Sequence, residues 1–227
     1  MMFLAVLSGC ATVRSPDPRD PLESFNRGVY KFNQTADRIA IKPLSKVYKT
    51  VLPGPLDTGI TNFFSNLSDV IVVANDLLQL KINQALSDST RIVFNSTIGI
   101  GGLVDVGDRI GLPKHHEDFG QTLGYWGVGP GPYLMIPLLG PSTVRDTLGH
   151  VADLYAFYPL SYLNSTTLQY GLFGLQYVDY RADQLSSEKV LEAAALDRYA
   201  FLREAYLQRR ESMIHDGNMP EQGEPEQ

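Results

Sequence analysis

The sequence predicts an all-α protein with a single domain of amphipathic and kinked helices. Apolar residues recur at spacings of three and four, prolines and glycines interrupt these stripes, and no clean membrane-spanning helix stands out. The 227 residues suffice for one large domain or two small ones, and no internal repeat or clear boundary divides them.

The chain starts with a short apolar run, residues 1–9, which ends at its single cysteine, Cys10. An apolar run closed by small residues is typical of a secretory signal peptide and its cleavage site. The segment 7–10, Leu-Ser-Gly-Cys, is similar to a lipobox, where bacterial lipoproteins are lipidated on the cysteine and cleaved before it. No basic residue precedes the run, so we expect the natural signal peptide to begin upstream of Met1.

The lipobox implies a multiply acylated N-terminus at Cys10. Each buried methylene contributes ~0.8 kcal/mol, so several acyl chains would hold the protein firmly to a membrane. The next residue is Ala11 rather than aspartate, and by analogy with enteric lipoproteins this favours sorting to the outer membrane. Residues 10–19 are mostly polar and contain two prolines, so they are expected to form an extended tether.

The first helix is expected to begin at Asp20. This aspartate can serve as the N-cap, with Pro21 at the first helical position and Glu23 three residues after the cap. An apolar stripe then recurs along one face: Leu22, Phe25, Val29, Phe32, Ala36 and Ile39. Charged residues lie on the other faces, so the helix is amphipathic.

Prolines and glycines divide the following part of the chain. Pro43 and the cluster 53–55 are expected to break it, with a short helix between them and another apolar stripe after them. The β-branched run 70–74 could form a strand in isolation, but leucines continue the apolar stretch and favour a helix. A further helical stripe is expected to end near Ile98, where glycines follow.

The middle of the chain, residues 119–178, holds only three charged side chains, Arg145, Asp146 and Asp153. Repeated glycines and prolines rule out a straight membrane-spanning helix in its first half. Aromatic residues crowd its second half, and aromatic rings with a polar tip suit membrane–water interfaces. A large buried core would explain the low charge as well, but a lipid anchor would place this surface beside a bilayer.

Beyond residue 178 the composition reverses, because residues 179–227 hold seventeen charges. One long helix is expected over about 187–213. The last segment, 216–227, is acidic and is expected to be disordered. The helical domain is therefore predicted to cover residues 20–215.

Signals for catalysis, metals and cofactors are weak. The net charge of −6 argues against nucleic-acid binding, and no serine lies in a Gly-x-Ser-x-Gly elbow. The His-His-Glu-Asp run at 115–118 is more typical of a solvated polar loop than of a metal site, and the glycines at 99–102 lack the preceding strand of a dinucleotide loop. We expect no enzymatic activity, metal or cofactor; Ser142 with His150 is a weak nucleophile–base candidate.

The segment 124–133 interleaves glycines with bulky residues and two prolines. Such a segment can turn tightly and can flex at its glycines. From the residues alone, a structural hairpin loop is favoured over a hinged gate beside an apolar passage.

Several motifs along the chain resemble those of one family. In chain order they are Asp20-Pro21-Leu22-Glu23-x-Phe25-Asn26-Arg27, Phe32-Asn33, Asn62-Phe63-Phe64-x-Asn66-Leu67, Asn95-Ser96-Thr97-x-Gly99-x-Gly101-Gly102-Leu103-x-Asp105-Val106, Glu117-Asp118-Phe119-Gly120-Gln121-Thr122-Leu123-Gly124-x-Trp126-Gly127-Val128-Gly129-x-Gly131-Pro132-Tyr133, and Pro137-Leu138-x-Gly140-Pro141-Ser142-x-x-Arg145-Asp146. Over roughly residues 17–213 the chain resembles the MlaA/VacJ family of outer-membrane phospholipid-transport lipoproteins.

This resemblance implies a ring-like domain of amphipathic helices within the outer membrane, with a Gly/Pro-rich hairpin loop beside a central channel. Members remove mislocalised phospholipids from the outer leaflet and pass them to a soluble periplasmic carrier protein, which maintains lipid asymmetry. The ring associates with trimeric porins. The resemblance therefore predicts a lipid-anchored protein that faces the periplasm from the outer membrane.

Carried over to this chain, the resemblance places the flexible hairpin at Gly127, Gly129 and Gly131. Phe32 and Asn33 fall where the first helix of the family influences channel opening, and the C-terminal helix would meet the carrier. Two alternatives stay open. One is a lipid-anchored scaffold that organises porins without conducting lipid, and the other is an enzyme of phospholipid breakdown.

Overall fold

The computed structural model describes residues 17–186 and 197–218. Cys10, the signal peptide, most of the tether and most of the acidic tail lie outside these residues, as does the start of the helix expected from about residue 187. The predominantly helical fold is confirmed, and a two-stranded antiparallel sheet adds to it. Among the described helices, none is both long enough and apolar enough to cross a membrane.

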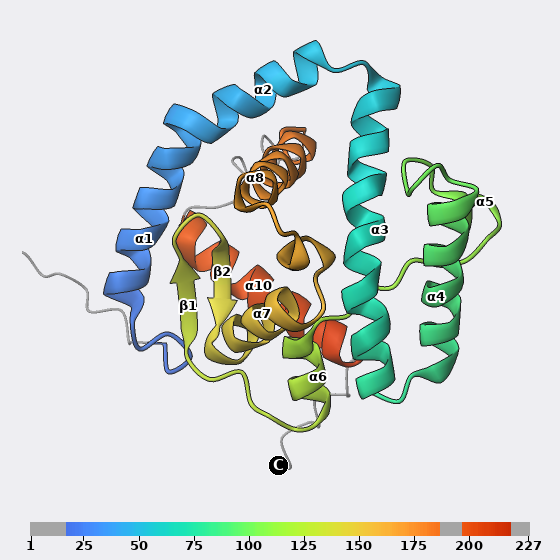
Figure 1. Ribbon diagram of the computed structural model, residues 1–227. Coiled ribbons are helices and arrows are strands. Elements are labelled where there is room, and N and C mark those ends of the chain that lie inside the picture. The colour runs from blue at the N-terminus through green and yellow to red at the C-terminus, as the bar shows by residue number, and fades with distance from the viewer. Residues whose placement is uncertain (1–16, 187–196, 219–227) are drawn as a thin grey trace, which may run out of the picture.

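Within residues 17–186 and 197–218, the elements follow one another as helices with one hairpin among them. They are α1 (Glu23–Ala36), the π-helical segment η1 (Asp37–Ile41), α2 (Lys42–Val51), α3 (Gly54–Leu78), α4 (Ile82–Thr97), α5 (Val106–Arg109), α6 (Phe119–Tyr125), β1 (Tyr133–Ile136), β2 (Gly140–Thr143), α7 (Val144–Ala156), the 3-10 turn η2 (Pro159–Tyr162), α8 (Thr166–Asp183) and α10 (Arg198–Ile214). In Figure 1, α1 and α2 form an arc at the left and top, α3 stands opposite with α4 outside it, and α8 lies within the arc.

The start of α1 differs from the prediction, because Asp20 does not cap the helix. Its fully buried carboxylate instead accepts hydrogen bonds from Asn26 Nδ2 (2.8 Å), the Tyr199 hydroxyl (2.5 Å) and Arg203 Nη1 (3.0 Å). The helix begins at Glu23, without a side-chain cap. A contact with the distant helix α10 therefore takes the place of the local one.

Pro43 was also expected to break the chain, and it does not. The segment η1 precedes it, and the backbone N–H of Lys42 donates to the Asp37 carbonyl five residues earlier. This wider π-helical turn leads into Pro43 near the start of α2, where a missing N–H is tolerated. The break comes later, at Pro53, where the backbone is extended.

Helices α3 and α4 form an antiparallel pair with polar side chains between them. The run 70–74 lies inside α3 and α4 ends next to Ile98, so both sequence predictions are confirmed. The buried positions of the pair include many polar residues: Asn66, Asp69, Asn75, Asp76, Asp88, Arg91 and Asn95. The large apolar side chains Leu86 and Val93 of α4 are exposed instead.

The apolar core is divided into two small clusters. One joins Phe64 of α3 to Tyr158 and Leu160 around η2. The other joins Tyr133 and Met135 of β1 to Tyr199 of α10, with edge-to-face contact between the two tyrosine rings. The second cluster fixes the hairpin between α1 and the C-terminal helix.

The glycine segment is not itself the hairpin that the residues suggested. Residues 126–132 connect α6 to β1, and the hairpin is the neighbouring pair β1–β2, in register from Tyr133 opposite Thr143 to Ile136 opposite Gly140. The turn occupies residues 137–139, and Leu138 adopts a left-handed conformation (φ +64°). The segment therefore delivers the chain to the hairpin rather than forming its tip.

Candidate functional site: an apolar pocket beside the hairpin tip

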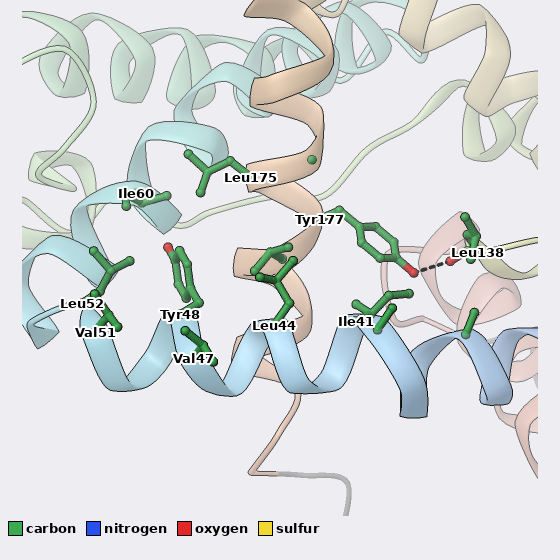
Figure 2. Close-up of a pocket in the computed structure, with 14 residues that line it drawn as sticks. Ile41, Leu44, Val47, Tyr48, Val51, Leu52, Ile60, Leu138, Leu175 and Tyr177 are labelled. Carbon is green, nitrogen blue, oxygen red and sulfur yellow. Dashed lines mark hydrogen bonds between the residues drawn. The ribbon is translucent and has the colours of Figure 1, made fainter.

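A pocket of about 880 Å³ lies between η1–α2 and α8, in the range of small-molecule sites. Its walls come from α1, η1, α2, α3, the hairpin turn and α8, as Figure 2 shows for the labelled residues. The lining residues are Ala36, Ala40, Ile41, Leu44, Val47, Tyr48, Val51, Leu52, Ile60, Leu138, Gly174, Leu175, Tyr177 and Val178. No charged residue is among them, so the pocket suits a hydrocarbon chain.

Two hydrogen bonds hold α8 against α2 at the floor of the pocket. The buried Ser45 hydroxyl donates to the Val178 carbonyl (3.3 Å), and the Tyr48 hydroxyl donates to Asp179 Oδ1 (2.7 Å). Burial and the neighbouring Asp179 carboxylate raise the pKa of Tyr48, so its hydroxyl stays protonated and remains a donor. Both bonds are made by polar residues on the α2 face that meets α8, while the aliphatic residues of α2 line the open space.

Ion pairs join the helices that form this apolar pocket, close in sequence to residues that line it. Arg181 of α8 pairs with Asp37 of η1 through two hydrogen bonds of 2.7 and 2.8 Å. Lys49 of α2 pairs with Asp57 of α3 (2.5 Å) and with Asp183 of α8 (2.8 Å). An apolar wall with charged groups at its rim matches the two-part chemistry of an amphiphile.

The hairpin turn is fastened at this pocket from two sides. On α1, Asn33 Nδ2 donates to the Ile136 carbonyl (2.9 Å), and the backbone N–H of Leu138 donates to Asn33 Oδ1 (2.8 Å). On α8, the Tyr177 hydroxyl donates to the Leu138 carbonyl (2.6 Å), the bond drawn in Figure 2. The turn therefore bridges α1 and α8 next to the pocket.

The five residues named for the channel or hinge are not gathered in one place. Asn33 holds the hairpin turn, whereas Phe32 is exposed and is absent from the pocket lining. Gly127, Gly129 and Gly131 do not line the pocket either. Gly127 (φ +88°) and Gly131 (φ +67°) have backbone conformations that favour glycine. The connection from α6 to β1 therefore requires glycine at these two positions.

The residues of α2 and α8 that line the pocket were missed as site residues. The stripe that includes Leu44, Val47, Tyr48 and Val51 was identified as a helix face, but nothing local shows that this face borders an open space. Gly174 in α8 gave a usable signal. A glycine inside a helix leaves room beside it, and a Cβ added there would meet nothing within 4 Å.

The weak enzyme candidate gains no support from geometry. Ser142 and His150 line a separate cavity of about 240 Å³, but the Ser142 hydroxyl is hydrogen-bonded to Thr147 Oγ1 (2.9 Å), and within the described residues no bond joins it to His150. The described part of the chain also holds no cluster of three or more candidate metal ligands.

The 115–118 run is a loop, as expected, but it is solvated only in part: His116 is exposed, whereas His115 and Glu117 are engaged in separate structural contacts. His115 Nδ1 lies 2.7 Å from Asp88 Oδ2. The buried Glu117 accepts from Gln79 Nε2 (2.7 Å) and Lys81 Nζ (2.8 Å). The side chains diverge, as adjacent residues should: Glu117 faces the protein interior, whereas His116 faces solvent.

Apolar side chains also cover the outer surface of several helices. In α4 the only two charged residues, Asp88 and Arg91, are both buried, so its outward face carries no charge. Most of the stripe predicted for the first helix is also exposed, although Val29 packs against the second apolar cluster and Ala36 lines the pocket. Exposed large apolar residues of this outer surface are Phe25, Phe32, Ile39, Ile82, Leu86, Val93, Ile98 and Ile100. Exposed apolar side chains in this number on several helices are typical of a surface that meets lipid or protein rather than water.

Comparisons with known proteins agree on one family. A family model described as MlaA lipoprotein matches residues 18–213. The chain is 34% identical over 227 residues to the intermembrane phospholipid transport system lipoprotein MlaA of Escherichia coli (strain K12), covering 97% of this chain and 89% of that protein. It is 31% identical to the protein of the same name from Haemophilus influenzae, covering 99% and 92% of the two chains.

An uncharacterized protein of Rickettsia bellii is also similar, at 33% identity over 92% of this chain and 80% of its own length. A solved structure described as the structural basis for maintenance of bacterial outer membrane lipid asymmetry matches with a TM-score of 0.76 and 34% identity. The match covers 86% of this chain and 98% of the other. The agreement of sequence and fold over nearly the whole length decides the matter: the chain belongs to the MlaA lipoprotein family.

Proposed function

We propose that this protein is an outer-membrane lipoprotein, anchored through Cys10, that removes mislocalised phospholipids from the outer leaflet and passes them to a periplasmic carrier protein. The names of its relatives from Escherichia coli and Haemophilus influenzae support phospholipid transport between membranes. The observation that carries the proposal is the pocket of about 880 Å³, which is lined without a charged residue and rimmed by ion pairs.

The physical need for such a route lies in the two-part chemistry of the lipid. A charged headgroup that crosses hydrocarbon loses its hydration and finds no partner, which costs many kcal/mol. A route with an apolar wall and charged groups alongside it accommodates the acyl chains and the headgroup at once. Here the aliphatic residues of α2 and α8 would take the chains, and groups such as Arg181 and Lys49 lie close enough to meet the headgroup.

The outer apolar surface supports the proposal that the protein lies within the membrane. Burying a fully exposed leucine or isoleucine side chain gains about 1.5–3 kcal/mol, so the apolar residues of α1, η1 and α4 together favour contact with acyl chains strongly. The arc of α1 and α2, with α3 opposite, supports the proposal of a ring-like domain with a passage through it (Figure 1).

We assign the remaining family features to this chain as parts of the same proposal. Gly127, Gly129 and Gly131 act as the hinge that allows the hairpin to move, because Gly127 and Gly129 have open space beside them. Helix α10 contributes to the face that meets the carrier, and the apolar exterior contributes to contact with a trimeric porin. Lipid flow is passive, driven by the lipid gradient or by the downstream transporter.

The test is to fill the pocket from a position that has room for a side chain. Gly174 lines the pocket, and Gly171, one turn earlier on α8, does not; a Cβ at either position meets nothing within 4 Å. Gly174→Phe should block lipid clearance, whereas Gly171→Phe should not, although both change helix propensity equally. The measurement is the amount of phospholipid exposed on the surface of cells that carry each variant, labelled with a membrane-impermeant amine reagent.

The same experiment separates transport from the scaffold alternative. A scaffold that only organises porins predicts that Gly174→Phe retains normal clearance while it still binds porin. Normal surface phospholipid in that variant, at natural protein levels in the outer membrane, would overturn the transport proposal in favour of the scaffold.

A further inference from the structure

We infer that Tyr177 is a positioning residue that latches the β1–β2 hairpin over one end of the apolar pocket, so that breaking its bond to Leu138 opens the pocket. The inference rests on the proposed function and adds to it the side chain that controls access. Tyr177 was not among the residues singled out in the sequence, and it lies in the charge-poor segment of α8.

The contact joins a pocket wall to the hairpin turn. The Tyr177 ring lines the pocket, and its hydroxyl donates to the Leu138 carbonyl at 2.6 Å. Leu138 lines the pocket as well, and Figure 2 shows the two residues meeting at one side of it. Releasing this bond would free a part of the pocket wall without disturbing α8 itself.

The two attachments of the turn are unequal. Asn33 makes two hydrogen bonds, to the carbonyl of Ile136 and from the N–H of Leu138, and so ties both sides of the turn to α1. Tyr177 makes one bond to the turn, from α8 across the pocket. The bond to Tyr177 is therefore the one that can open while the hairpin stays attached to α1.

The turn has left-handed backbone at Leu138 and open space beside Gly140, where it meets β2. Leu138 has a φ of +64°, Gly140 has a φ of +92°, and a Cβ at Gly140 would meet nothing within 4 Å. A non-glycine residue such as Leu138 is strained in this left-handed region and stays there only where its surroundings hold it. Two hydrogen bonds hold Leu138 there: its N–H donates to Asn33 Oδ1, and its carbonyl accepts from the Tyr177 hydroxyl.

A single hydrogen bond is the right strength for a latch. The net contribution of one such bond changes an equilibrium by roughly two- to tenfold, which is enough to favour the closed state and small enough to reverse. Burial raises the pKa of Tyr177, so the hydroxyl keeps its proton and acts as a donor throughout the physiological pH range.

The test removes one oxygen atom. Tyr177→Phe keeps the ring in the pocket wall and loses the bond to Leu138, and Tyr180→Phe is the matched control, because Tyr180 is exposed on the same helix and does not line the pocket. The full lipidated protein is reconstituted into phosphatidylethanolamine–phosphatidylglycerol vesicles that contain a fluorescent-chain phosphatidylethanolamine. Two quantities are measured. The first is the rate at which the protein takes up the fluorescent phosphatidylethanolamine, and the second is the rate of hydrogen exchange in peptides covering residues 133–143.

Tyr177→Phe should raise the uptake rate and the exchange rate of the hairpin roughly two- to tenfold, with the melting temperature little changed. A merely structural tyrosine would slow uptake when altered, or leave it unchanged. Unchanged or slower uptake in Tyr177→Phe, while Gly174→Phe still blocks uptake, would overturn the latch and leave the proposed function intact. Undiminished uptake in Gly174→Phe would overturn the proposed function instead.

Discussion

The interface between α3 and α4 and the pocket between α2 and α8 are opposites in chemistry. At the first, helices close over polar groups, and Asn75, Asp76, Asp88 and Arg91 are each at most 1% exposed. At the second, aliphatic side chains border an open space, and Leu44 is 54% exposed. Polar groups therefore stabilise the packed interior, and apolar groups are left for a ligand or for the surroundings.

This distribution is the reverse of that in a water-soluble protein, where large apolar side chains are the ones most often buried. Exposure to water is unfavourable for the apolar side chains Ile82, Leu86 and Val93 of α4, whereas exposure to hydrocarbon would be unfavourable for its aspartate and arginine. Hydrogen bonds tie the polar interior together: Asn75 Nδ2 donates to Asp153 Oδ1 (2.9 Å), and the Thr122 hydroxyl donates to Asn75 Oδ1 (2.7 Å). The network links α3 to α6 and α7.

The largest effect on stability is expected at Arg91. Its guanidinium donates to Asp105 Oδ2 (2.6 Å) and to the Leu112 carbonyl (2.7 Å) while almost fully buried. Arg91→Met would leave both acceptors without their donor and Asp105 without its cation, and the free energy of unfolding should fall by about 3–5 kcal/mol. Thermal unfolding in detergent measures this. The exposed Arg109→Met is the control, and an equal loss in both variants would show that the polar interior does not stabilise the fold.

Replacing Asp76 is expected to change the free energy of unfolding by a smaller amount and in the opposite direction. Burial and the nearby Asp88 and Glu117 carboxylates raise the pKa of Asp76 to about 8, and neither of its oxygens accepts a hydrogen bond. In the unfolded chain this group ionises near its usual pKa of about 3.9. The folded state therefore holds the proton more tightly, and the free energy of unfolding should fall as pH rises from about 4 to about 8.

Asp76→Asn should remove this slope, because an amide does not ionise and can donate to the unpartnered Oδ1 of Asp88. The variant should be more stable than the natural protein by about 2–4 kcal/mol at pH 8 and little changed at pH 4. Chemical unfolding at both pH values in the same detergent gives the comparison. Parallel pH profiles for the two proteins would mean that Asp76 is already ionised at neutral pH.

The contrast between the two regions also explains what the sequence could and could not predict. Helices α3 and α4 were predicted because apolar periodicity and glycines act locally. The role of Asp20 was not, because its partners Tyr199 and Arg203 are far away in sequence. The break predicted at Pro43 was wrong because a π-helical turn precedes this proline and the helix continues through it.

For the site, the sequence identified the stripe of α2 but could not predict what that stripe faces. Periodicity separates two faces of a helix and does not say whether the apolar one meets a core, a cavity or a bilayer. Asn33 was reached through the family resemblance alone. Tyr177 carried no local signal, because its function depends on the position of a hairpin 39 residues away in sequence.

The smallest effect is expected inside the pocket, at Leu44. A leucine truncated to alanine in a packed core costs about 2–5 kcal/mol, and Leu160, which is 4% exposed, should follow that rule. Leu44 already borders open space, so Leu44→Ala creates no new enclosed cavity and should lower the free energy of unfolding by less than about 1 kcal/mol. It should also leave lipid uptake undiminished, since it widens the space. If Leu44→Ala destabilised the protein as much as Leu160→Ala, α2 and α8 would have to close on each other in solution, and the pocket would be core rather than a lipid route.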